Sequence, residues 1–229
     1  MKKLADMNLL DDFLFWTLIS DKEYGSQFAR YLLQVILQRA VGSVKIHAQY
    51  SLPGNDTDLH GIRLDAYISE EYMASDGTER IDGELYDVEP NKRRSDKTEL
   101  PLRVRYYHAL IDTRSLKSGN NYTSLQRTYV IMITDFDPFD RNRVVYTVRN
   151  KCLEEPDLPY EDGLCTVFIY TDGEQANLPE NLVQLLRFMK ATKRENAVNS
   201  DLKAIQKMVD DMKQREPDTV RKYESEWTK

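Results

Sequence analysis

The sequence predicts an α/β fold, in which helices pack on a mixed β-sheet. Two observations indicate this class. Along the chain, the spacing of apolar residues changes from the helical period of about 3.6 residues to the alternation typical of a strand. In the central part, the predicted elements follow in the order helix, three strands, helix and strand. Helices before, between and after strands are typical of a sheet that helices cover, and 229 residues are enough for one large domain.

The first predicted elements are two helices and a strand. Residues 8–20 place apolar side chains at helical spacing, and Asn8 is expected to cap this helix. Residues 26–40 predict a second helix with one strongly apolar face, which ends near Gly42. The period then changes, because apolar and polar residues alternate in residues 44–48. We therefore expect a strand there.

A β-hairpin is expected next. Residues 62–69 and 84–91 both alternate between apolar and polar side chains, and a turn-rich stretch around Gly77 separates them. If the turn centres near Gly77, residues that face each other have numbers that sum to about 154. Asp65 then faces Glu89, and both side chains project to the same side of the hairpin.

The second half of the chain follows the same two periods. A near-continuous apolar run, residues 128–134, is expected to be a central strand covered on both faces. The helix before it is expected to have Gly119 as its C-terminal cap. Since no strong linker interrupts the chain, we treat residues 1–195 as one domain and residues 196–229 as its C-terminal helical extension and polar tail. The other predicted elements are helices 100–117, 179–194 and 200–214 and strands 143–149 and 164–170.

The composition argues against several classes of protein. A net charge of −6 does not suit a protein that coats nucleic acid non-specifically, because such affinity comes mainly from basic side chains. Cys152, Cys165 and the three histidines show no metal-ligand spacing, so we expect reduced thiols and no zinc site. No apolar run approaches the roughly 20 residues that cross a bilayer, and the chain does not start like a secretory signal. We therefore expect a cytoplasmic protein without a membrane partner.

Acidic residues gather on one face of the predicted hairpin. By strand parity, Asp87 and Asn91 lie on the side of Glu89, so two or three carboxylates converge with Asp65. Carboxylates this close repel each other unless a cation or a proton lies between them, and their hard oxygens favour Mg²⁺, Mn²⁺ or Ca²⁺. A divalent ion held there could activate and orient a water molecule for attack on a phosphodiester. The alternative is that these side chains only form the solvent-facing surface of a strand.

A basic segment follows the second strand of the hairpin. Between residues 92 and 105 the sequence has six basic and two acidic residues, although the chain as a whole is acidic. Beside a metal site this segment could hold phosphates, whereas as a solvated loop and helix face it needs no function. The candidate nucleic-acid contacts are Lys92, Arg93, Arg94, Arg103 and Arg105.

Five separated blocks of the sequence carry a family resemblance. They are GIRLDAYI (61–68), YDVEPNK (86–92), LRVRYYHALID (102–112), YVIMITDFDPF (129–139) and NKCLEEPDL (150–158). In this order they resemble the PD-(D/E)XK nuclease family transposases, relatives of the recombination-promoting nucleases of bacteria. Residues 11–19 and 181–189 look similar too, so the resemblance covers nearly the whole chain.

The resemblance implies a restriction-endonuclease-like αβββαβ core with flanking N- and C-terminal helices. It also implies a metal-dependent DNA endonuclease linked to recombination or mobile elements, with DNA as partner and Mg²⁺, Mn²⁺ or Ca²⁺ as cofactor. Asp65 and Glu89 stand where the family has its metal-binding acids, and the backbone carbonyl of Pro90 where another ligand is common. Asp12 matches an acidic residue that helps to hold the metal, and Asn91 takes the third catalytic position. A homodimer would suit double-strand cutting.

The chain departs from the family pattern at three positions. Asn91 stands where this branch carries glutamine, Trp16 where relatives often have lysine, and Pro90 lies inside a predicted strand. Asparagine keeps the amide on a shorter side chain, and proline removes a ladder hydrogen bond, which favours an edge or a bulge. Such a bulge could swing Lys92 toward the metal and restore a cation. The second hypothesis is therefore a catalytically decayed relative that acts as a DNA-binding or protein-interaction module.

Overall fold

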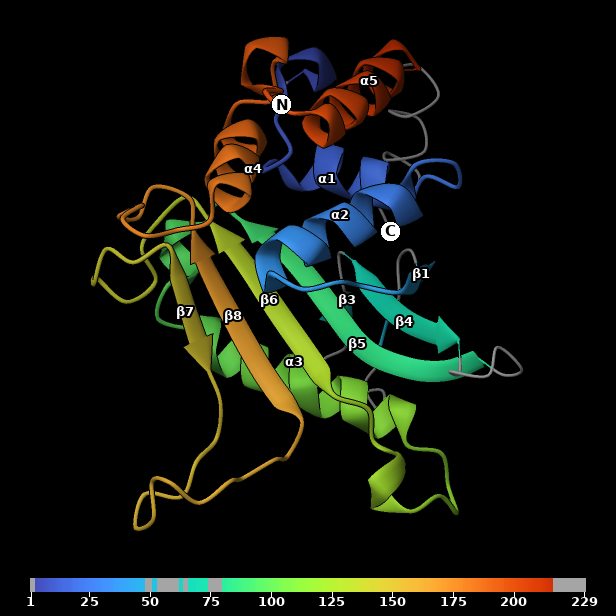
Figure 1. The fold of residues 1–229 in the computed structure, drawn as a ribbon, viewed down its shortest axis with the longest axis vertical. Coiled ribbons are helices and arrows are strands. Elements are labelled where there is room, and N and C mark those ends of the chain that lie inside the picture. Colours follow the sequence, from blue (N-terminus) through green and yellow to red (C-terminus); the bar gives the residue numbers. More distant parts are fainter. Residues whose placement is uncertain (1–2, 48–50, 53–61, 64–65, 74–79, 216–229) are drawn as a thin grey trace.

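A mixed β-sheet forms the centre of the molecule (Figure 1). The structure is a computed structural model that describes residues 3–47, 51–52, 62–63, 66–73 and 80–215. Within these residues the sheet has six strands, namely β1 (Ser43–His47), β4 (Tyr67–Met73), β5 (Arg80–Asn91), β6 (Thr128–Thr134), β7 (Val145–Val148) and β8 (Leu164–Tyr170). Their order is β1-β4-β5-β6-β8-β7, in which β5–β6 and β6–β8 are parallel and the other neighbours antiparallel. A separate antiparallel pair consists of β2 (Ser51–Leu52) and β3 (Ile62–Arg63).

Helices cover both faces of this sheet (Figure 1). One face shares a large apolar core with α1 (Asp12–Ile19), α2 (Gly25–Leu37), α4 (Glu180–Lys190) and α5 (Ser200–Gln214). The other face forms a smaller core with α3 (Leu100–Ser115). The short 3₁₀ helices are η1 (Leu4–Asp6), η2 (Arg94–Asp96), η3 (Tyr122–Ser124) and η4 (Arg194–Asn196). The expected class, helices on a mixed sheet, is therefore confirmed.

Strand parity divides the apolar side chains between the two cores. β6 is buried along its whole length, with Ile131 and Ile133 in the larger core and Val130 and Met132 in the smaller one. A strand whose two faces are both covered has no polar face to show in its sequence. The near-continuous apolar run of residues 128–134 therefore predicts this central strand correctly.

β4 and β5 form the predicted hairpin, but its first strand begins at Tyr67 rather than at residue 62. Ile62 and Arg63 belong instead to β3, which pairs with β2 in the separate two-stranded sheet. Tyr67 pairs with Asp87, whose numbers sum to 154, and the next two pairs keep this register. A β-bulge then interrupts the register between Ser69 and Glu71. The expected register is therefore confirmed where β4 begins, which is the end of the hairpin that carries the candidate acids.

Two predicted helix caps are wrong. Asn8 does not cap the first helix, because its side chain accepts a hydrogen bond from the backbone N–H of Thr192 at 3.0 Å, and α1 begins after Asp11. A side chain committed to a distant segment is not available to its own helix. On α3 the C-cap is Leu116 rather than Gly119, and Gly119 adopts a φ of +88° in the turn that follows.

The C-terminal helix belongs to the larger core. Leu202 and Val209 of α5 are fully buried in the same cluster as the apolar residues of α1 and α2. Among the described helices, none combines the length and the apolar character that a bilayer crossing requires. Residues 216–229, which belong to the predicted polar tail, lie outside the described residues.

Candidate functional site

The candidate site lies at the carboxyl end of β5, where this strand meets the first turns of α3 and the start of α1. Tyr86 and Val88 point into the larger core. Since successive side chains of a strand point to opposite faces, Asp87, Glu89 and Asn91 point to the side of α3. The even-numbered apolar residues of β5 thus face the side with four helices, and the odd-numbered polar residues face α3.

These three polar side chains are not solvent-facing. Asp87 is 0% exposed, Glu89 2% and Asn91 5%. The alternative, that they form only the solvent-exposed surface of a strand, is therefore wrong, because α3 packs over this end of the strand. A buried carboxylate raises the free energy of the fold unless hydrogen bonds or a cation compensate for its lost hydration. The surroundings of Glu89 therefore decide what the site can do.

Glu89 is held by two side chains of α3. Its Oε2 atom lies 3.2 Å from Nη2 of Arg103 and 3.5 Å from the hydroxyl of Tyr107. Nε of Arg103 donates to the same hydroxyl at 2.7 Å. Arg103 and Tyr107 are four residues apart, so they lie on one side of the helix and reach the carboxylate together. The arrangement is an ion pair with a phenol beside it.

The Tyr107 phenol stays protonated in these surroundings. Burial raises its pKa, and the nearby charge of Glu89 raises it further, while Arg103 acts in the opposite direction. Asp87 also contributes to the raised pKa, so both β5 carboxylates act on this hydroxyl. A protonated phenol donates a hydrogen bond, and Tyr107 therefore acts as a neutral donor toward Glu89.

Asn91 presents a free amide donor. Its Oδ1 atom accepts a hydrogen bond from the backbone N–H of Arg93 at 2.7 Å, which fixes the orientation of the amide. Its Nδ2 atom is buried and has no hydrogen-bond partner among the described residues. A buried donor without a partner costs free energy, typically about 1–3 kcal/mol. Such a donor can hold a water molecule or a phosphate oxygen, but it cannot accept a proton.

Pro90 does not bend the strand toward a new register. The pairing of β5 with β6 continues without a shift to Asn91. The N–H of Val88 donates to the carbonyl of Ala66, on the β4 side of the strand. Backbone groups two residues apart point to the same side of a strand, so the nitrogen and the carbonyl of Pro90 also point to the β4 side. The missing donor of Pro90 therefore leaves the β5–β6 ladder intact, and the expected bulge is absent from this ladder.

The expected swing of Lys92 toward the candidate site is not seen, because its side chain forms an ion pair with α1. Its Nζ atom lies 2.8 Å from Oδ1 of Asp11, at the N-cap of α1. This exposed ion pair ties the end of β5 to the start of α1. Asp12 follows as the first residue of α1, and burial raises its pKa, with Arg93 as the main opposing influence. Asp12 thus lies beside the end of β5, although no contact joins it to Glu89 in the described hydrogen bonds.

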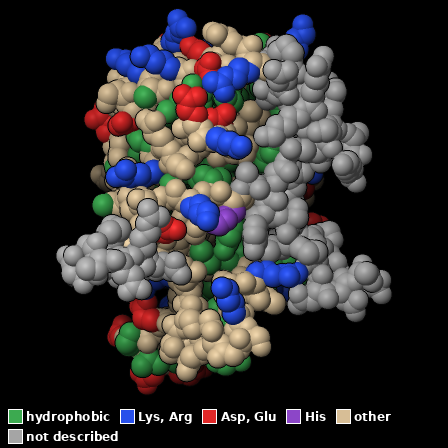
Figure 2. Space-filling view, turned by 90° about the vertical axis from the view of Figure 1, so that its right-hand side faces the viewer, with side chains coloured by type: hydrophobic (Ala, Val, Ile, Leu, Met, Phe, Trp, Pro, Cys, Tyr) green, Lys and Arg blue, Asp and Glu red, His purple; other side chains and the backbone are tan. Residues whose placement is uncertain are grey.

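The predicted nucleic-acid residues divide between two places. Arg103 reaches Glu89, whereas Arg105 lies on the other flank of α3 and lines a pocket against β7 and β8. Arg93 and Arg94 are exposed. On the face shown in Figure 2, the described Lys and Arg side chains are scattered among Asp and Glu rather than gathered into one basic patch.

Asp65, the second predicted metal ligand, lies outside the described residues. The two positions that follow it are described, since Val88 donates to the carbonyl of Ala66 at 3.1 Å and Tyr67 faces Asp87. Within the described part of the chain, no group of three or more His, Cys, Asp or Glu side chains is arranged to hold a metal ion. A metal site that includes Asp65 would therefore combine a described residue, such as Glu89, with one that lies outside the described residues.

A second buried polar cluster was not expected from the sequence. Glu70 of β4 is fully buried and accepts hydrogen bonds from the Tyr86 hydroxyl and, at 2.5 Å, from the backbone N–H of Gly42. Arg39 donates to the same hydroxyl at 2.6 Å and pairs with Glu84. One feature of the sequence could have indicated it. Tyr86 lies among the apolar residues on one face of β5, and the hydroxyl of a buried tyrosine needs a hydrogen-bond partner. Arg127 lies 3.8 Å from Glu84, so two arginines face the two carboxylates, and this cluster ties the end of α2 to the hairpin.

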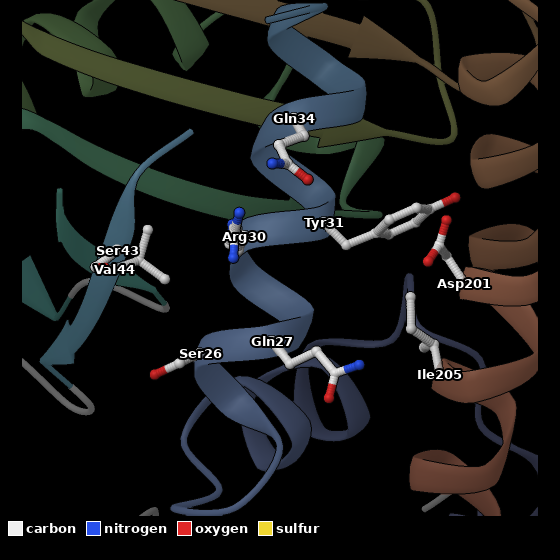
Figure 3. Close-up of a pocket in the computed structure, with 9 residues that line it drawn as sticks. All are labelled: Ser26, Gln27, Arg30, Tyr31, Gln34, Ser43, Val44, Asp201 and Ile205. Atoms are coloured by element: carbon white, nitrogen blue, oxygen red, sulfur yellow. The ribbon is translucent and has the colours of Figure 1, made fainter. Parts of the chain in front are cut away.

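A hollow of about 470 Å³ lies between α2, β1 and α5 (Figure 3). In Figure 3, Tyr31 of α2 points its hydroxyl toward Asp201 of α5, and burial raises the pKa of this phenol. Nε of Arg30 donates to the backbone carbonyl of Val41 at 3.2 Å. The lining contains one carboxylate and no histidine or cysteine, so it offers hydrogen bonds but no acid–base pair.

Comparisons with known proteins add no relative. No model of a protein family matches the chain, and no match is found among curated proteins or solved structures. The interpretation of the site therefore depends on its own residues and geometry.

Proposed function

We propose that this protein is a metal-dependent DNA endonuclease of the PD-(D/E)XK superfamily, linked to recombination or mobile elements. One observation carries the proposal: Asp87 and Glu89 are buried carboxylates at the end of a hairpin strand. Two carboxylates in such a place need compensating positive charge. Arg103 supplies a single positive charge to Glu89. A divalent cation, recruited with Asp65, would add positive charge at the same place.

The order of elements supports the same proposal. If the short strands β2 and β3 and the 3₁₀ helices are set aside, helix α2, strands β1, β4 and β5, helix α3 and strand β6 have the order of an αβββαβ core. In a restriction-endonuclease-like core the acids come from adjacent strands of the hairpin. Glu89 belongs to β5, and Asp65 comes two residues before the start of β4. The hairpin register at Tyr67 and Asp87 leads toward a pairing of Asp65 with Glu89.

The proposed cofactor is Mg²⁺, with Mn²⁺ or Ca²⁺ as alternatives. Asp65 and Glu89 would hold the ion, and the Pro90 carbonyl and the Asp12 carboxylate would be further ligands. All four donors are hard oxygen atoms, which fit these ions. A bound ion would lower the pKa of a water molecule and polarise the scissile phosphate.

The chain's own residues would position the reactants. The buried Nδ2 donor of Asn91 would hold the attacking water or a phosphate oxygen. Tyr107 and Arg103 would fix the orientation of Glu89 by donating to its Oε2 atom. The exposed guanidinium groups of Arg93 and Arg94 would contact the DNA backbone.

Cleavage of supercoiled plasmid tests the proposal. With Mg²⁺ or Mn²⁺ we expect the parent to nick or linearise the plasmid, and Asp65→Ala and Glu89→Gln to cut roughly a hundredfold more slowly or less. Isothermal titration with Mn²⁺ should show binding to the parent that both variants lose. Glu195→Gln is the matched control, because this exposed side chain lies on η4 and should leave both measurements unchanged. A Glu89→Gln variant that cuts at the parent's rate would exclude Glu89 from the site.

One observation favours a second candidate function, a decayed relative that binds DNA or a protein without cutting. Arg103 already compensates Glu89 at 3.2 Å, so a metal must share or displace this partner. If a folded parent cuts under none of the three metals but still raises the fluorescence anisotropy of labelled duplex DNA, this second function is the better account. Light scattering during gel filtration shows whether the protein is the homodimer that double-strand cutting would suit.

A further inference from the structure

A pocket of about 590 Å³ lies between α3 and the strands β7 and β8. Figure 1 shows α3 crossing behind the sheet, with β7 at the sheet's edge. The pocket is on the flank of α3 that faces away from Glu89, because it is lined by Arg105 and His108, whereas Arg103 and Tyr107 reach the carboxylate. Its volume falls within the range of small-molecule sites, about 300–1,000 Å³. It is therefore a separate place in which a ligand of limited size fits.

His108 gives the pocket a buried polar centre. The side chain is 6% exposed, and its Nε2 atom lies 3.0 Å from the Thr166 hydroxyl on β8. Its Nδ1 atom has no hydrogen-bond partner among the described residues. Burial lowers the pKa of His108 to about 4, so the ring is neutral at pH 7. Depending on which ring nitrogen carries the proton, Nδ1 donates or accepts one hydrogen bond, and in this structure that capacity is unused.

The walls of the pocket are aromatic. Phe168 of β8 is buried, and Phe139 packs edge-on against it with ring centroids 5.0 Å apart at 89°. Both line the pocket beside His108. Planar rings pack well against such walls, since offset and edge-to-face arrangements stabilise aromatic pairs by about 0.5–1.5 kcal/mol beyond the area that they bury.

Two arginines provide positive charge at the pocket. Arg105 and Arg149 are both exposed and both line it. Arg105 forms no ion pair with any described residue. Asp112 is the carboxylate in the lining, so its single negative charge stands against the positive charges of two arginines. The balance of charge at the pocket therefore favours a negatively charged group.

We propose that this pocket binds a small aromatic anion, whose ring lies against Phe139 and Phe168 and whose acidic group meets Arg105 or Arg149. A ring nitrogen or oxygen would use the open position at Nδ1 of His108. Two sources share this chemistry, a nucleoside monophosphate and an aromatic carboxylate. The proposal does not depend on the proposed metal site, because Glu89 is not among the residues that line the pocket.

Isothermal titration of the full chain tests this site with three probes. They are 2′-deoxyadenosine 5′-monophosphate, indole-3-acetate and the neutral control 2′-deoxyadenosine. We expect at least one of the two anions to bind at concentrations up to a few millimolar, and the neutral nucleoside to bind roughly tenfold more weakly than its phosphate if the monophosphate is the ligand. Binding of the phosphate alone identifies a nucleotide site, and binding of indole-3-acetate alone identifies a carboxylate site. The proposal is overturned if neither anion binds, or if the neutral nucleoside binds as well as its phosphate.

Variants locate the binding. At least one of Arg105→Ala and Arg149→Ala should weaken binding of the anion roughly tenfold, because it removes the charge that meets the acidic group. His108→Leu should weaken binding by a similar factor, because it removes a hydrogen bond. Ala109→Trp should fill the pocket and abolish binding. Because Ala109 is exposed, this variant should fold, and it therefore tests the pocket even where His108→Leu does not fold. Arg141→Ala, an exposed arginine outside the lining, should leave the affinity unchanged. If Ala109→Trp binds as the parent does, the pocket is not the site.

The Glu89→Gln variant separates this proposal from the endonuclease function. Because Glu89 does not line the pocket, this variant should bind the anion with the affinity of the parent. A protein that never cuts DNA but binds the anion leaves the pocket proposal intact. Loss of anion binding in Glu89→Gln would mean that the probe occupies the β5 site instead, which overturns the pocket proposal.

Discussion

Tyr107 and His108 are neighbours on α3, but they lie in different surroundings. Tyr107 turns to Glu89 on β5, and His108 turns to Thr166 on β8. Burial is the first cause of both pKa changes, and it acts in opposite directions, raising the value for Tyr107 and lowering it for His108. The common reason is that burial disfavours the charged form, a phenolate in one case and an imidazolium in the other. Both side chains are therefore neutral hydrogen-bonding groups at neutral pH.

The lowered pKa of His108 predicts a pH dependence of stability. The ordinary value is 6.5 and the folded value about 4, so between these two the unfolded chain binds more protons than the folded one. The contribution of His108 is fully present above pH 6.5 and is lost as the pH falls toward about 4. Between pH 7 and pH 4, we expect the free energy of unfolding of the parent to fall by roughly 3 kcal/mol more than that of His108→Gln.

Urea denaturation at several pH values between 4 and 7 measures this difference. Carboxylates also titrate in this range, but they do so in both proteins, so the subtraction isolates His108. Thr166→Ala is the control, because it removes the hydroxyl beside Nε2 and keeps the titrating ring. Its stability should retain the pH dependence of the parent. Parallel curves for the parent and His108→Gln would show that burial does not hold this ring neutral.

At the level of elements, local periodicity predicted most of the fold. The strands 128–134 and 164–170 and the helix 200–214 have the expected bounds. The hairpin register also followed from its turn. The two wrong caps have a different origin, since Asn8 bonds to Thr192, a residue far along the chain. Such long-range partners leave no periodic signal in the sequence.

The candidate site was only partly predictable for the same reason. The alternation of side chains placed Asp87, Glu89 and Asn91 on one face of β5. It could not distinguish a solvent-exposed face from one that a helix covers, as is the case here. That distinction depends on α3, which begins nine residues after the strand ends and folds back over it. The link between Glu89, Arg103 and Tyr107 therefore appears only when the chain is folded.

The junction of α1 and α2 depends on a glycine. A Cβ atom at Gly25 would lie 2.2 Å from the backbone carbonyl oxygen of Ile19, so the two helix ends approach too closely for a side chain. We expect Gly25→Ala to lower the free energy of unfolding by about 1–3 kcal/mol, because the backbone of α1 would have to move. Equilibrium urea denaturation measures the change.

Ser26→Ala is the matched control for this junction. Ser26 is the next residue of α2 and is exposed, so alanine there should change the stability by about 0.5 kcal/mol or less. Equal stability of Gly25→Ala and the parent would mean that the helix ends separate without cost.

The first and last described segments of the chain contact each other. Nζ of Lys213 on α5 donates to the backbone carbonyls of Ala5 at 3.0 Å and Met7 at 2.8 Å. The hydroxyl of Tyr24 donates to Asp211 at 3.0 Å. These bonds surround the apolar contact between α1 and α5 in the larger core. The four helices on this face therefore share one apolar core with the sheet.

This arrangement predicts that α5 unfolds together with the sheet. Leu202 is fully buried, and Leu202→Ala should lower the free energy of unfolding by about 2–5 kcal/mol, because it leaves a cavity in the shared core. Lys203→Ala changes the exposed neighbour and should have little effect. Helix content by far-ultraviolet circular dichroism and tertiary packing by tryptophan fluorescence should follow the same urea transition in all three proteins. A separate early loss of helix in Leu202→Ala, with the fluorescence transition unchanged, would instead show that α5 is an appendage whose loss the sheet and the candidate site survive.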